Sequence, residues 1–126
     1  MKRSAALIPL SHQHHTVLSY TARIIRAATA ADHEVLLAKF SAFLHNHLEP
    51  HFTEEERDLL PRLAAIGETQ LVARTLDEHA QLRALATAIE GGDKAALTPF
   101  GTLLQAHVRF EERELFAVAE ARLYSA

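Results

Sequence analysis

Apolar residues recur along the chain at spacings of three and four, which is the period of an amphipathic α-helix and not of a β-strand. Four helices account for nearly all of them, over residues 11–30, 32–61, 69–90 and either 93–123 or 98–123. Ser11 and Asp32 are the expected N-caps of the first two helices, and Gly91 and Gly92 end the third. Because the connections are short, we expect an all-α, up-down-up-down antiparallel four-helix bundle.

The second helix contains a proline inside its apolar pattern. Pro50 removes one backbone hydrogen bond and pushes against the carbonyl of Asn46, so we expect a kink there. The pattern keeps its phase across the proline, and Pro61 marks the expected end of the helix. The residues predicted to face inward are Leu36, Phe40, Leu44, His47, His51, Glu55 and Leu59.

The composition limits which chemistry the chain can perform. Its 126 residues make one domain, 1–126, with a net charge of −3, no cysteine and nine histidines. The missing cysteine excludes disulfides and thiolate ligands, so nitrogen and oxygen must hold any metal. A mildly acidic chain without a basic block or an 18-residue apolar run predicts no nucleic-acid partner and no membrane span. We see no signal peptide and expect a cytoplasmic protein.

A short motif occurs twice, once in each of two predicted helices. His51 to Leu59 and His107 to Leu115 share the pattern His-x-x-x-Glu-Glu-Arg-acid-Leu. Residues four apart lie on one face of a helix, so each His can present a nitrogen next to the carboxylate of Glu55 or Glu111. Both pairs fall on the apolar face, where a buried carboxylate beside an imidazole is costly without a cation. The repeat therefore predicts a buried metal site.

The other two helices add one histidine each. His79 shares a face with Leu76, Leu82 and Ala86. In the first helix, alignment with the third favours His15, whereas the helical wheel of its apolar residues centres nearer to His14, and we choose His14 because direction relative to the core decides ligation. His47 lies four residues before His51, and we expect it to hold a ligand by a hydrogen bond. His12, His33 and His45 are expected at the surface.

These residues together resemble the hemerythrin-like family, also called the HHE cation-binding domain. The family pattern is matched by His14, His51 with Glu55, His79, and His107 with Glu111, over nearly the whole chain. The resemblance implies two iron ions in a bundle, bridged by the two glutamates, with zinc or manganese as alternative metals. It implies a protein that binds O2 or a related molecule such as NO, for storage, sensing or detoxification.

The chain also departs from the oxygen-carrying members of that family. Those carriers have two histidines four apart on the third helix, whereas Thr75 and Arg83 stand four residues before and after His79. One iron is therefore expected to lack a histidine, which leaves a site for water, a small ligand or a substitute residue. The carriers also place the last carboxylate five residues after its histidine, at Glu112, whereas the broader pattern uses Glu111.

Two further functions follow from the same residues. The first is an iron-holding or iron-responsive module, in which metal occupancy controls stability or the binding of protein partners that the sequence does not identify. The second is weak oxidase or peroxidase activity at open iron positions. The sequence contains neither the Glu-x-x-His pairs of ferritin-like oxidases nor the His-Glu-x-x-His of zinc peptidases, and it assigns no catalytic residue.

Overall fold

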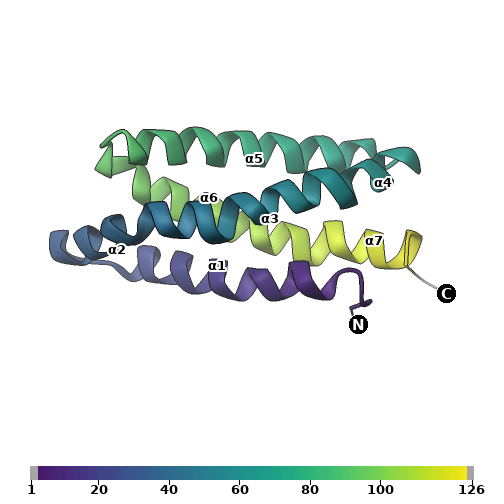
Figure 1. The fold of residues 1–126 in the computed structure, drawn as a ribbon, viewed down its shortest axis with the longest axis horizontal. Helices are drawn as coiled ribbons and strands as arrows, with labels where there is room; N and C mark the ends of the chain where they lie inside the picture. The colour runs from purple at the N-terminus through teal and green to yellow at the C-terminus, as the bar shows by residue number, and fades with distance from the viewer. Residues whose placement is uncertain (1–2, 125–126) are drawn as a thin grey trace.

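In a computed structural model, which describes residues 3–124, the chain forms four helical rods packed as an antiparallel bundle (Figure 1). The first rod is α1 (Ile8–Arg26) and the third is α5 (Thr69–Glu90). The second rod comprises α2 (Ala30–Phe43), α3 (Glu49–Glu54) and α4 (Leu60–Ala65), joined by π turns. The fourth follows a 3₁₀ turn, Lys94–Ala96, and comprises α6 (Leu97–Phe110) and α7 (Phe116–Arg122). The predicted fold is confirmed.

Three π turns interrupt the second and fourth rods. They are Leu44–Leu48, Glu55–Leu59 and Glu111–Leu115. A π turn bonds each N–H to the carbonyl five residues earlier, so it takes in one more residue than an α-helical turn does. The last two turns begin at Glu55 and Glu111, the equivalent glutamates of the repeated motif, so the repeat extends to the backbone.

Several helices begin or end at residues other than the predicted ones, because different residues cap them. α1 begins at Ile8, with Pro9 in its first turn where a missing N–H costs nothing, and not after Ser11. Thr29, and not Asp32, is the N-cap of α2, and Asp32 is its partner three residues on in a capping box. Pro61 does not end the second rod, because it lies in the first turn of α4, just after a π turn where the hydrogen-bond pattern is already interrupted.

The π turn Leu44–Leu48 also changes which side chains face the core. It lies directly before the segment that contains Pro50, and its extra residue moves the inward position from His47 to Leu48. In α1 the inward positions run through Val17 and Ile24, so Ile25 is exposed. Leu76 of α5 is likewise exposed, since the buried positions of that helix run through Thr75, His79 and Leu82.

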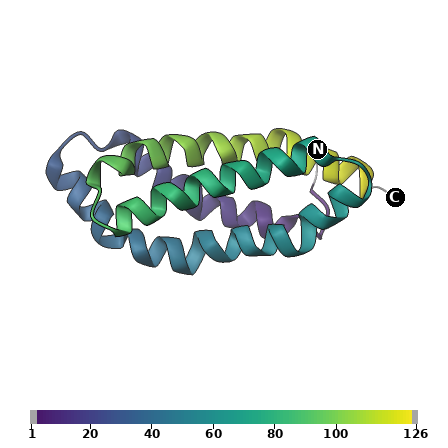
Figure 2. The same cartoon turned by 90° about the horizontal axis from the view of Figure 1, so that it is seen from above.

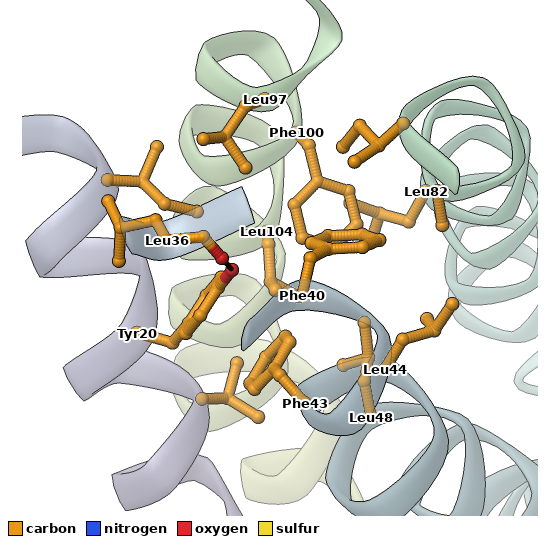
Figure 3. Close-up of a cluster of buried hydrophobic side chains, with 14 of the residues drawn as sticks. Tyr20, Leu36, Phe40, Phe43, Leu44, Leu48, Leu82, Leu97, Phe100 and Leu104 are labelled. Atoms are coloured by element: carbon orange, nitrogen blue, oxygen red, sulfur yellow. Dashed lines mark hydrogen bonds between the residues drawn. The ribbon is translucent and has the colours of Figure 1, made fainter. Parts of the chain in front are cut away.

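Two apolar clusters fill the bundle, one towards each end. The larger one joins all four rods around Phe40 and Phe100 (Figure 3). The smaller one, around Leu63 and Phe116, lies at the end where α1 begins and α7 ends (Figure 2). α1 packs closely along α6, where Gly101 leaves room for Ile24. Within residues 3–124, no helix has the length and hydropathy that a membrane span requires.

Candidate metal centre

Four histidines and two glutamates meet in the middle of the bundle, between the two apolar clusters. The ring of His14 stacks on Phe116 of the smaller cluster, and the ring of His79 stacks on Phe52 of the larger one. Every rod contributes to this group, and none of its residues is more than 2% exposed. The members are the six residues predicted from the sequence: His14, His51, Glu55, His79, His107 and Glu111.

The six residues form two overlapping quartets that share both carboxylates. One quartet is His14, His51, Glu55 and Glu111, and the other is Glu55, His79, His107 and Glu111. Within each quartet, one donor atom per residue lies within 4.8 Å of all the others. Two histidines and two carboxylates per position form a donor set that suits iron, zinc or manganese.

The first quartet places two imidazole nitrogens side by side. The Nε2 atoms of His14 and His51 are 3.1 Å apart. The Oε1 atom of Glu111 lies 2.9 Å from the first nitrogen and 3.5 Å from the second. The Oε2 atom of Glu55 lies 3.3 Å from the Nε2 of His51.

The second quartet uses the other oxygen of each carboxylate. The Oε1 atom of Glu55 lies 3.2 Å from the Nε2 of His79, and the Oε2 atom of Glu111 lies 3.2 Å from the Nε2 of His107. Each carboxylate therefore turns one oxygen to each quartet. This is the arrangement of a carboxylate that bridges two cations.

The outer nitrogen of each histidine is hydrogen-bonded to an oxygen that can only accept. Because Nδ1 then carries a proton, Nε2 is the nitrogen left to bind a cation once it has given up any proton of its own. The distances from Nδ1 to the accepting oxygen are 2.7 Å for His14 to Glu112, 2.5 Å for His51 to Gln13, 2.7 Å for His79 to Glu56 and 2.6 Å for His107 to Glu78.

These four acceptors follow the internal repeat, and the sequence analysis missed their role. Glu56 and Glu112 directly follow the two shared glutamates, and each accepts from a histidine of the other half of the chain. Gln13 and Glu78 directly precede His14 and His79, and each accepts from the histidine of the next rod. The doubled glutamate of the repeated motif was the signal that could have revealed the first pair.

Arginines hold three of the four acceptors in place. Arg83 bonds to Glu56 and to Glu49, and Arg74 bonds to Glu78. Glu112 accepts from Arg3 and from the hydroxyl of Ser11. Burial would raise the pKa of Glu112, but these bonds and the one from His14 lower it to about 2.

The fourth acceptor differs, because it is an uncharged amide. The Nε2 atom of Gln13 donates to Glu54, at 3.3 Å, which leaves its carbonyl oxygen to accept from His51. The quartet of His79 and His107 is therefore backed by two carboxylates, and the quartet of His14 and His51 by only one. The two positions have the same inner donors but different surrounding charge.

Several inward-facing atoms of the centre have no hydrogen-bond partner. They are both oxygens of Glu55, the Oε2 atom of Glu111, and the Nε2 atoms of His79 and His107. Buried polar atoms without partners are rare in folded proteins, since each costs the free energy of its lost hydration. A cation in each quartet would bind all five atoms, so the residues present fit a pair of metal ions.

The pKa values show what balances the carboxylates when no metal is bound. Burial lowers the pKa of His51, but Glu55 and Glu111 outweigh burial and raise it to about 10. Burial also lowers the pKa of His107, but Glu111, together with Glu78 and Glu55, outweighs burial and raises that pKa to about 10. Protons on these imidazoles supply the positive charge that the carboxylates need, and metal ions would replace them.

The remaining candidates lie away from the centre. His15, the rival of His14, is exposed, and Glu112 supports His14 from outside the quartets. His47 is exposed beside the ring of Phe43, and the expected bond from His47 to a ligand is wrong, since Gln13 fills that role for His51. His12 and His45 are exposed as predicted, whereas His33 is half-buried.

The third helix supplies no second histidine and no substitute for one. Thr75 is buried but donates to the carbonyl of Leu71, and Arg83 is bound to Glu49 and Glu56. The resemblance led us to expect one position poorer in histidine than the other, but each quartet contains two. Four protein donors leave room for further ligands at both positions.

An antiparallel four-helix bundle with His and Glu quartets at its centre is the fold and site of a metal-binding helical domain. The sequence model of the hemerythrin HHE cation-binding domain matches residues 8–119. The chain therefore belongs to this family. Neither a curated protein nor a solved structure gives a significant match.

Proposed function

We propose that the chain is a non-haem di-iron protein that binds O2 or a related small molecule such as NO, for storage, sensing or detoxification. The two glutamates that each turn one oxygen to either quartet support this proposal best. His14, His51, His79 and His107 would hold the ions from the four rods, and Glu55 and Glu111 would bridge them. An iron pair, when bound, supplies electrons and free coordination positions for such a molecule.

The protein's own residues set the conditions for that binding. The apolar clusters on either side keep bulk water from the centre, where every ligand is buried. The acceptors at Nδ1 orient each imidazole and make it a stronger donor. The open positions that four donors leave at each ion are where a small molecule would bind.

Metal analysis combined with absorption spectroscopy tests this proposal. The chain, reconstituted with ferrous iron under nitrogen, is expected to hold two iron ions and to gain near-ultraviolet charge-transfer bands after exposure to O2. Parallel reconstitutions with zinc and manganese test the alternative metals. Fewer than one iron per chain, or zinc retained in preference to iron, would contradict the proposal.

A second candidate function is an iron-holding module whose stability depends on metal occupancy. The carboxylate oxygens of Glu55 and Glu111 that have no hydrogen-bond partner favour it. Ions that satisfy them stabilise the folded chain by mass action. Thermal unfolding with and without iron measures this effect. An unchanged midpoint would contradict the module while leaving small-molecule binding to be judged from the spectra.

A further inference from the structure

A hollow of about 560 Å³ lies between α1 and the second rod, outside the metal centre. Two fixed cations, Arg23 of α1 and Lys39 of α2, line it together with hydrogen-bonding groups of Ser19, Asn46 and His47. No carboxylate is among its lining residues. We call this hollow the α1–α2 groove.

The cations of the α1–α2 groove are exposed and have no acidic partner. Among the other described cations, Arg26, Arg62, Arg109 and Arg113 also form no ion pair, whereas six are paired with a carboxylate: Arg3, Arg57, Arg74, Arg83, Lys94 and Arg122. Residues 8–26, which form α1, include no Asp or Glu. In a chain of net charge −3, this makes the groove a local site of positive charge.

The acidic residues nearest in sequence to Lys39 are already in use. Asp32 lies in the neighbouring hollow, where its carboxylate accepts from the backbone N–H groups of Ala28 and Thr29. Glu34 is paired with Lys94. Neither carboxylate lines the α1–α2 groove, although Arg23 also lines the hollow that contains Asp32.

Two stacked aromatic rings form the floor of the groove. The rings of Tyr20 and Phe43 are 4.1 Å apart and nearly parallel (Figure 3). The hydroxyl of Tyr20 donates to the carbonyl of Leu36 at 2.7 Å. Tyr20 is 7% exposed and Phe43 is 5% exposed, so the floor offers a small area of carbon, against which an apolar group can rest.

The groove continues towards the metal centre. A neighbouring hollow, also about 560 Å³, shares Thr16, Asn46 and His47 with it and is lined further on by Gln13 and His51. The π turn Leu44–Leu48 supplies Asn46 and His47 at this junction. A molecule in the groove would therefore lie on the side of the quartet backed by the uncharged Gln13.

We propose that the α1–α2 groove binds a small organic anion, with its phosphate or carboxylate at Arg23 and Lys39 and its flat apolar body over Tyr20 and Phe43. A ligand of the groove therefore needs one anionic group attached to a ring. Two cations are too few to follow a nucleic-acid backbone. Binding needs no metal, so the proposal can be tested separately from the proposed function.

The test is a nuclear magnetic resonance titration of the metal-free and the metal-loaded chain. Adenosine monophosphate combines a ring with a phosphate, and benzoate combines a ring with a carboxylate. Adenosine lacks the anionic group, and inorganic phosphate lacks the ring. The two ring anions are tested separately, and at least one is expected to shift the amide resonances of Ser19 and Asn46 and to bind more tightly than adenosine or phosphate. If neither ring anion binds, or if phosphate alone binds as tightly, the proposal is wrong.

Charge-matched variants show whether the groove itself is responsible. Arg23→Gln and Lys39→Gln each remove one unpaired surface charge and are expected to weaken binding by about fivefold to tenfold. Arg62→Gln, an exposed cation of α4 outside the groove, is expected to leave the affinity unchanged. Equal weakening by all three variants would mean attraction to net charge alone and would overturn the proposal.

Discussion

The carboxylate of Glu78 accepts a hydrogen bond from Nδ1 of His107 at 2.6 Å. Its counterpart in the other half of the chain is the amide of Gln13, which accepts from His51. A carboxylate acceptor makes the imidazole a stronger donor to a cation than an amide does. The two metal positions are therefore expected to differ in affinity, with the one at His79 and His107 the tighter.

Glu78→Gln should remove this difference. We expect one of the two metal-binding steps to weaken by about 10- to 100-fold, as measured by competition with a chelator. Glu114→Gln is the matched control, because Glu114 contacts the same Arg74, at 3.5 Å, but no histidine of the centre. If both variants weaken binding equally, the effect comes from net charge and not from the bond to His107.

Loss of an inner histidine should reduce the metal content of the chain. His107→Gln removes one of four donors from its quartet and leaves Glu111 without that neighbour, so we expect no more than one ion per chain after reconstitution. His45→Gln is the control, since His45 is exposed and bonds only to Glu90, at 3.0 Å. Two ions retained in the His107 variant would remove that residue from the ligand set.

The metal-free chain should lose stability as the pH rises above neutrality. The pKa values of His51 and His107 are raised from 6.5 to about 10, so the folded state holds protons that the unfolded state releases. This stabilisation is complete below pH 6.5 and is lost as the pH rises to about 10, with a slope of about 1.4 kcal/mol per pH unit for each proton.

Urea unfolding in the presence of a chelator, at several pH values across this window, measures the effect. The metal-loaded chain is the control, because ions replace the protons and the slope should be smaller. A free energy of unfolding that stays constant between pH 6.5 and pH 10 would contradict the protonated state of the metal-free centre.

The close packing of α1 on α6 gives a prediction independent of metal. A Cβ atom built on Gly101 lies 2.6 Å from Cγ2 of Ile24, so Gly101→Ala should destabilise the fold by about 1–3 kcal/mol. Alanine's higher helix propensity offsets about 1 kcal/mol at most. Combining Gly101→Ala with Ile24→Ala should cost less than the sum of the two single changes, and strict additivity would contradict this contact.

The bundle could be predicted because its apolar spacing is regular over four long segments. The third helix, 69–90, was placed correctly at both ends. Errors arose at the helix caps and where the backbone departs from 3.6 residues per turn. The π turn Leu44–Leu48 places Leu48 in the core, where His47 was expected. A search for the α-helical period does not detect such a turn.

The six central residues could be predicted to lie together because each falls on an inward face in a repeated pattern. Whether they bind metal stays a prediction. Gln13 and Glu78 were missed because they lie beside the inward face, and only the packing of neighbouring rods brings them to a histidine. The α1–α2 groove was missed for a similar reason, since residues of two helices line it.

The sharing of Glu55 and Glu111 between the quartets has a consequence for how the molecule holds together. Residues 8–65 contribute His14, His51 and Glu55, and residues 69–122 contribute His79, His107 and Glu111. Neither of these two helical halves contains a full quartet, because each lacks the glutamate of the other. The centre is thus a joint between two similar halves, and separating them would break both quartets at once.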